Sequence, residues 1–140
     1  AETGHLVLAT LHTPNAFQTI ERITAVFPAA QQQQIVLQLA NSLQAVIVQN
    51  LIPRADRQGR ALAYEVMIAN SAVRNVIREN NIHQLHNVVE TGRKDGMITM
   101  DRCLADLYQR AVITYDAAIS RARNPDSIQR TNSRRSAEEP

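Results

Sequence analysis

The sequence has little of several residue types that mark common classes of protein. Its 140 residues include one cysteine, Cys103, so the chain can form neither an internal disulfide framework nor a zinc site built from cysteines. No apolar run approaches the roughly 18 residues of a membrane span. Residues 1–5 hold neither a basic cluster nor a long apolar core, so they do not form a signal peptide, and the lack of an initial Met indicates a processed, trimmed or excised product. Together these features favour a reducing, cytoplasmic setting.

Net charge is also small, and it is concentrated at the C-terminal end. The whole chain carries +2, and residues 121–140 account for it with five arginines against three acidic residues. The remaining ten basic and ten acidic residues cancel. A neutral body does not predict nucleic-acid binding, which usually needs a basic stripe on the folded domain. We expect residues 126–140 to form a basic, disordered tail, and binding of that tail to nucleic-acid phosphates or acidic lipids is the alternative.

The first quarter of the chain has the pattern of a strand followed by helices. Leu6–Leu11 is almost wholly apolar and rich in strand formers, which predicts a strand covered on both faces in a parallel sheet. Thr13 is the expected N-cap of a helix whose first residue is Pro14. Apolar residues follow at helical spacing: Phe17, Ile20, Ile23 and Phe27. Pro28 ends that helix, and a second helix is expected over residues 29–44.

The period then changes to that of strands and returns to that of helices. Residues 46–52 and 60–68 predict two strands of a hairpin, joined by the turn-rich segment 53–59. From residue 70 onward the pattern is helical, with N-caps expected at Asn70 or Ser71, at Thr99 and at Thr114. The predicted fold class is therefore α/β: a strand-helix unit and a β-hairpin, followed by a small all-helical subdomain.

Two histidines flank the expected first strand. His5 and His12 are seven residues apart, which is roughly 23 Å along a strand, so they cannot ligate one metal ion. His12 follows the C-terminal end of the strand, the edge at which open α/β sheets bind ligands. There His12 and Thr13 could both donate hydrogen bonds to a phosphate. A purely structural histidine is the alternative reading of His12.

These residues form a motif with a known parallel. Thr3-Gly4-His5, the apolar run, and Thr10-Leu11-His12-Thr13-Pro14-Asn15-Ala16 resemble the His box of the type II/type IV secretion-system ATPases. A second motif, Ser71-Ala72-Val73-Arg74-Asn75-Val76-Ile77-Arg78-Glu79, resembles the Ala-Ile-Arg-Asn-Leu-Ile-Arg-Glu motif of the PilT-like pilus-retraction branch. The similarity covers residues 1 to 125, in order. Relatives in the extension branch carry a four-cysteine insertion, so the single cysteine favours the retraction branch.

On a helix the second motif has an apolar face and a charged face. Ala72, Val73, Val76 and Ile77 are expected to face inward. Four polar residues lie on the other sides of the helix: Arg74, Asn75, Arg78 and Glu79. Periodicity alone favours a solvated charged face. The resemblance instead implies that these four residues contact a partner or a neighbouring subunit.

The resemblance also implies a fold, an activity and a location. Residues 1–69 would be the C-terminal part of a RecA-like P-loop ATPase core, residues 70–125 its helical C-terminal subdomain, and residues 126–140 the tail. The complete protein would be a homo-hexamer that hydrolyses ATP with Mg²⁺, drives type IV pilus retraction and twitching motility, and works with an inner-membrane pilus platform protein. It would be cytoplasmic and peripheral at the inner membrane. His12 would sense the γ-phosphate, with weaker roles for His5 and for Thr13 in nucleotide binding.

The groups that hold phosphates in such enzymes are missing from the sequence. A P-loop needs a glycine-rich turn followed by Lys and Ser or Thr. The chain has four glycines, none in that context, and its one lysine is Lys94. We therefore expect the chain alone neither to bind ATP tightly nor to hydrolyse it, and to be marginally stable, oligomeric or rearranged. The alternative is a non-enzymatic helical protein-interaction module, and a Walker A loop encoded upstream would exclude it.

Other candidates are weaker. Cys103 could pair with His83 or His86 as a thiol catalyst, but its place on a helix predicts a buried, inert thiol. His83 and His86 are three residues apart and lack an evident third metal ligand, so surface histidines are expected and no metal site is predicted. Tyr108 and Tyr115 are expected to pack.

Overall fold

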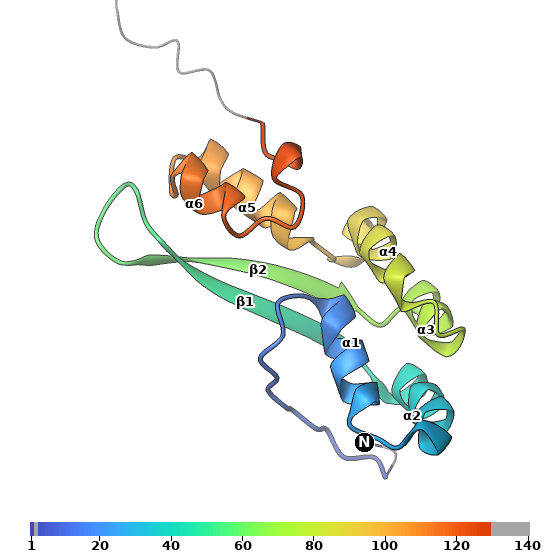
Figure 1. Cartoon of the computed structure of the whole chain (residues 1–140). Helices are drawn as coiled ribbons and strands as arrows, with labels where there is room; N and C mark the ends of the chain where they lie inside the picture. Colours follow the sequence, from blue (N-terminus) through green and yellow to red (C-terminus); the bar gives the residue numbers. More distant parts are fainter. Residues whose placement is uncertain (2, 130–140) are drawn as a thin grey trace, which may run out of the picture. The chain divides into compact units, whose positions relative to one another are not determined.

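A computed structural model describes residue 1 and residues 3–129 (Figure 1). The predicted tail 126–140 therefore lies outside the described residues from position 130 onward. The helices are α1 (Ala16–Ala25), α2 (Ala29–Ser42), α3 (Ser71–Arg78), α4 (Leu85–Thr91), α5 (Met100–Gln109) and α6 (Tyr115–Ile119). The strands are β1 (Ala45–Pro53) and β2 (Arg60–Ile68), and short 3₁₀ turns are η1 (Ile82–Gln84), η2 (Gly92–Asp95) and η3 (Pro125–Ser127).

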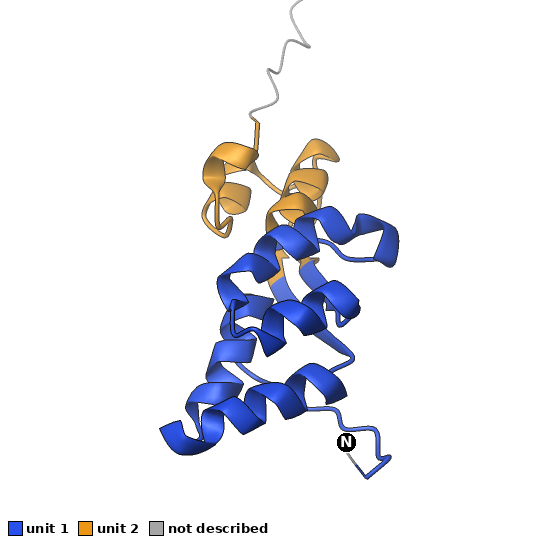
Figure 2. Cartoon of the chain, turned by 90° about the vertical axis from the view of Figure 1, so that its right-hand side faces the viewer, with its two compact units in different colours: residues 1–50, 64–100 blue, residues 51–63, 101–140 orange. Residues whose placement is uncertain are grey.

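The chain divides into two compact units, coloured separately in Figure 2. Among the described residues, unit 1 contains residues 1, 3–50 and 64–100, and unit 2 contains residues 51–63 and 101–129. The hairpin contributes residues to both. These units describe packing within this chain, and the division into an ATPase core, a helical subdomain and a tail stays a prediction. Among the described residues, no helix is long and apolar enough to cross a membrane.

Helix packing in unit 1 follows the apolar stripes of the sequence. Helix α2 packs against α1 and α3, and α3 packs against α4. The largest fully buried side chains among the described residues of this unit are Ile20, Met67, Val73, Ile77 and Leu85. The predicted inward face of α3 is confirmed for Val73, Val76 and Ile77, but it is wrong for Ala72, which is exposed at the margin of that stripe.

The start and end of α3 are set by two asparagines. Asn70 is the N-cap, and its side-chain oxygen accepts a hydrogen bond from the Val73 N–H at 3.0 Å. At the other end Asn80 has a φ of +55°, the left-handed conformation that commonly terminates helices and that asparagine tolerates better than most residues. The predicted N-cap of this helix is therefore confirmed, and each end of the helix has a local chemical cause.

The predicted hairpin is confirmed, with β1 and β2 as neighbours in a two-stranded sheet. Buried and exposed residues alternate along β2, as expected for strands with one covered face. The turn closes with a hydrogen bond from the Arg54 N–H to the Gly59 carbonyl at 3.1 Å. Gly59 has a φ of +108°, a conformation that side chains other than glycine rarely adopt.

An ion pair in this turn gives a pH-dependent signal. The Arg54 guanidinium donates two hydrogen bonds to Asp56, and this lowers the pKa of the Asp56 carboxyl below its ordinary value of 3.8. A lowered folded pKa means that the pairing is present at neutral pH and is lost as the pH falls through the folded pKa. We expect the ¹⁵Nε chemical shift of Arg54 to titrate with a midpoint below 3.8. In Asp56→Asn the shift should be flat, and a wild-type midpoint above 3.8 would contradict the pairing.

The strand predicted over Leu6–Leu11 is wrong for this structure. The segment is extended but pairs with no strand, and Figure 1 draws it as coil running up to α1. Its side chains are open to solvent, with Leu6 80% and Leu8 88% exposed. A strand exists only through hydrogen bonds to neighbouring strands, and the two strands of the described residues pair with each other. Apolar composition predicted the extended backbone but could not supply a partner for it.

The start of α1 also differs from the prediction. The N-cap is Asn15, whose side-chain oxygen accepts from the Gln18 N–H at 2.8 Å, and the first helical residue is Ala16. Thr13 is therefore not the cap, and Pro14 precedes the helix. Asparagine is at least as good an N-cap as threonine, which accounts for the shift of two residues.

A buried carboxylate in α5 binds two later backbone N–H groups of unit 2. Asp101, 8% exposed, accepts hydrogen bonds from the backbone N–H groups of Arg123 and Asn124 at 2.7 and 2.9 Å.

Thr114 caps α6 as predicted, accepting from the Ala117 N–H at 3.2 Å. The predicted packing role of Tyr108 and Tyr115 is confirmed, since their ring centroids are 5.5 Å apart. Cys103 is buried, as predicted.

Candidate functional site

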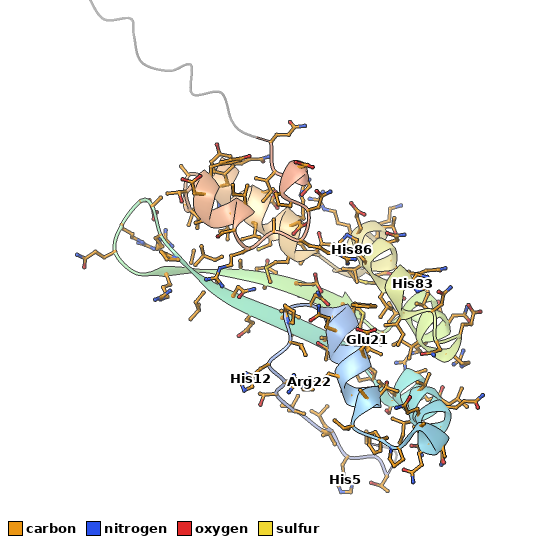
Figure 3. The ribbon with its side chains drawn as sticks, viewed as in Figure 1. His5, His12, Glu21, Arg22, His83 and His86 are labelled. Atoms are coloured by element: carbon orange, nitrogen blue, oxygen red, sulfur yellow. The ribbon has the colours of Figure 1, made fainter. Side chains whose placement is uncertain are left out.

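The His-box residues lie on the extended segment before α1. Figure 3 places His5 and His12 at separate points along this segment, both exposed. His5 is within hydrogen-bond distance of the Thr3 hydroxyl, with Nδ1 and Oγ1 3.0 Å apart. The structure therefore brings His12 and Thr13 together, as chain neighbours, and leaves His5 apart from them.

Thr13 takes part in a hydrogen-bond network that fixes the first turn of α1. The Thr19 hydroxyl donates to the Asn15 carbonyl at 2.9 Å. That bond uses the one hydroxyl proton of Thr19, so Thr13 must be the donor in the contact between the two hydroxyls at 2.6 Å. A Thr13 hydroxyl engaged in this way is a structural element of the helix start. This hydrogen bond therefore fixes the position of Thr13, the residue that directly follows His12.

A buried carboxylate holds the same helix start from the hairpin side. Glu65, on β2, is 6% exposed. Its Oε1 accepts a hydrogen bond from the Ala16 N–H at 2.7 Å, and its Oε2 accepts one from the Met100 N–H at 3.3 Å. Ala16 is the first residue of α1, where the free N–H groups and the helix dipole favour negative charge.

Glu65 was not selected as a site residue by sequence reasoning, although a signal was available. Buried side chains alternate along β2 at Ala61, Ala63, Glu65 and Met67. A glutamate in phase with small apolar residues faces the covered side of the strand, where a charged group needs partners. The sequence could have identified such a residue, but not the two N–H groups that satisfy it.

The arginines of the second motif contact α2 within this chain. Arg74, half-buried, donates from Nη1 to the carbonyls of Ala40 and Asn41, both at 2.7 Å. Arg78 is exposed and donates to the Asn41 side-chain oxygen at 3.3 Å. The two Arg74 bonds satisfy carbonyl groups in the last turn of α2, where carbonyls have no partner within their own helix. Their predicted contact with a partner or neighbouring subunit stays a prediction.

Asn75 and Glu79 form a pair of their own on the same helix. The Asn75 amide donates to the Glu79 carboxylate at 2.8 Å, and both side chains are exposed. Glu79 is the C-cap of α3, so this contact joins the last turn of the helix to its cap. Their predicted partner contact is likewise untested by this geometry.

Replacing Arg74 by alanine is expected to lower the free energy of unfolding by about 2 kcal/mol, because two charge-assisted hydrogen bonds to carbonyls are lost. Arg78→Ala is the matched control and should cost about 0.5 kcal/mol or less, because its single contact is exposed and long. Urea denaturation followed by circular dichroism measures both. Equal effects of the two substitutions would contradict the capping role of Arg74.

The described residues hold no metal cluster. No group of three His, Cys, Asp or Glu side chains in this part of the chain is placed to hold an ion. His83 is exposed at the 3₁₀ turn before α4, and His86 is half-buried in α4 (Figure 3).

The fold and both motifs define a class of protein. The family described as "Type II/IV secretion system protein" matches residues 1–136, and this chain belongs to it.

Two individual proteins of known name are similar to this chain in sequence. The chain is 48% identical over 128 residues to the "Twitching motility protein" of Neisseria gonorrhoeae, covering 91% of this chain and 34% of the relative. It is 42% identical over 128 residues to the "Type IV pilus retractation ATPase PilT" of Pseudomonas aeruginosa, covering 91% of this chain and 37% of the relative. The chain thus spans about a third of the length of the curated relatives it matches.

Solved structures agree with this assignment. A crystal structure of the pilus retraction motor PilT with bound ADP superposes with a TM-score of 0.80 at 42% identity, over 90% of this chain and 35% of that one. The Legionella pneumophila ATPase DotB superposes with a TM-score of 0.70 at 20% identity, over 84% of this chain and 32% of that one. The second likeness concerns the fold alone.

Proposed function

We propose that this chain is part of a hexameric ATPase motor that drives type IV pilus retraction and twitching motility. The observation that carries the proposal is the match to the pilus retraction motor PilT with bound ADP, at a TM-score of 0.80 and 42% identity over 90% of this chain. The motor would be cytoplasmic, peripheral at the inner membrane, and would act on an inner-membrane pilus platform protein. Residues 1–69 would belong to its RecA-like core, and residues 70–125 to the helical C-terminal subdomain.

Within the motor, His12 would contact the γ-phosphate of ATP and report its presence. His12 is exposed, so its imidazole is accessible to a ligand. An imidazole N–H can donate to a phosphate oxygen, and such donors stabilise charge that develops during phosphoryl transfer. His5 would have a weaker role at the other end of the segment, and Thr13 would support the nucleotide site through its contact with Thr19.

The residues present fit an accessory contact to the nucleotide and not a complete phosphate cradle. The sequence has no glycine-rich phosphate loop, and the described residues offer no three-ligand metal cluster. We therefore assign ATP binding in part to His12 and propose that these 140 residues alone neither bind ATP tightly nor hydrolyse it.

ATP hydrolysis by the full-length protein that carries this chain tests the proposal. We expect His12→Ala to lower kcat roughly 100-fold, the scale of losing one positioned donor. His83→Ala, which removes an exposed histidine of the same unit, is the matched control and should leave kcat unchanged. Full-length protein without ATPase activity, or equal kcat in the two variants, would contradict the proposal. Turnover by the 140-residue chain above its own His12→Ala variant would contradict its inactivity.

A further inference from the structure

The Glu65 carboxylate joins three segments of unit 1. Its own strand is β2, Oε1 binds the Ala16 N–H at 2.7 Å, and Oε2 binds the Met100 N–H at 3.3 Å. At 6% exposure, water cannot readily replace either contact. One side chain therefore fixes two otherwise separate backbone positions relative to the hairpin.

The Met100 side of this arrangement is reinforced by backbone pairing. Val66, the residue after Glu65, exchanges two hydrogen bonds with Ile98, at 2.9 and 3.1 Å. That bridge holds the segment leading to Met100 alongside β2. Backbone pairing thus holds the segment that Oε2 contacts, and Oε1 binds the Ala16 N–H at the start of α1.

The start of α1 in turn determines where His12 lies. Ala16 is four residues after His12, and the intervening residues are tied together by the Asn15 cap and by the contact between Thr13 and Thr19. A displacement of the Ala16 N–H would move this capped turn as a unit. His12 directly precedes this turn in the chain and would move with it.

We infer that Glu65 is a positioning residue that fixes the His12–Thr13 segment relative to β2 and couples that segment to Met100. Its consequence for catalysis rests on the proposed function of His12. Each carboxylate oxygen of Glu65 accepts a hydrogen bond from a backbone N–H, so the contacts that carry the inference are to the main chain.

The two oxygens predict a graded series of variants. Glu65→Gln retains one acceptor oxygen, but its NH₂ group would face the second N–H, donor against donor. Glu65→Ala removes both acceptors. Glu21→Gln and Glu21→Ala are matched controls, because Glu21 lies exposed on α1.

Residue-resolved amide exchange of this chain tests the contacts without reference to activity. In Glu65→Ala the Ala16 and Met100 amides should exchange at least about tenfold faster, with the core amides of α3 unchanged. If Glu65→Ala does not fold, Glu65→Gln is measured, and at least one of the two amides should lose protection. Wild-type exchange rates for both amides in a folded Glu65 variant would overturn the inference.

ATP turnover of the full-length protein tests the catalytic consequence. Glu65→Gln should lower kcat at least about tenfold with KM changed less than about twofold, since misplacement of a catalytic contact affects the reaction step. Combining Glu65→Gln with His12→Ala should add little further loss, because Glu65 acts through His12. A wild-type kcat in Glu65→Gln, or full additivity in the double variant, would overturn the positioning role. If the wild-type protein itself lacks turnover, the proposed function fails, and amide exchange alone decides the position of Glu65.

Discussion

Replacing Ile77 by alanine is expected to lower the free energy of unfolding of this chain by about 3 kcal/mol, one of the largest effects of any single substitution. Ile77 has no exposed surface and lies on the inward face of α3. Removing three carbon atoms there loses their burial and leaves a cavity that the packed helices α2 and α4 cannot fill completely. Urea denaturation monitored by circular dichroism gives the value.

Ile47→Ala is the matched control, because it makes the same chemical change on the open face of β1. Ile47 is 61% exposed, so its truncation should cost less than about 1 kcal/mol. Where Ile77→Ala leaves no cooperative transition, Ile77→Val should still be destabilising by about 1 kcal/mol. Equal costs at positions 77 and 47 would show that the packing of α3 is not as described.

The second large effect concerns self-association. We expect the chain to form oligomers through the Leu6–Leu11 segment, which forms no strand with the described residues and has open apolar side chains. Burying one leucine side chain is worth at least about 1.5 kcal/mol, so losing two weakens association by about 3 kcal/mol, or roughly 100-fold in Kd. The double substitution Leu6→Lys and Leu8→Lys should therefore shift the chain toward monomer in sedimentation velocity.

A single exposed apolar residue elsewhere provides the control for this experiment. Val26, just after α1, is 73% exposed but lies outside the extended segment. Val26→Lys should leave the association unchanged. A wild-type chain that stays monomeric throughout the concentration series would refute the expectation, and so would equal effects of the two sets of substitutions.

Local pattern was sufficient to predict most of the secondary structure. The hairpin, three of the four predicted inward residues of α3 and the Thr114 cap depend on residues close in sequence, and each is present. The error at Leu6–Leu11 has a different origin, since a strand depends on a partner that the segment's own composition does not specify.

The candidate site was predicted only in part, because a segment's own sequence does not specify the distant residues that it contacts. His12 and Thr13 are chain neighbours, so their proximity was certain, whereas the bond from Thr13 to Thr19 depends on the turn between them. The contacts of Arg74 with the end of α2 join residues 33 and 34 positions apart, and those of Glu65 join residues 35 and 49 positions apart. Periodicity places each side chain on a face of its helix or strand but does not identify what that face meets.

The Asp101 contacts carry a practical consequence for shortened versions of the protein. The carboxylate is buried and satisfied by N–H groups that come 22 and 23 residues later, at Arg123 and Asn124. A chain truncated before Arg123 would leave this charge without its donors in a covered position, which favours aggregation during expression. Ile128, only 2% exposed, extends the requirement a few residues further. Expression boundaries, and any protease site for removing a C-terminal tag, should therefore lie beyond Ile128.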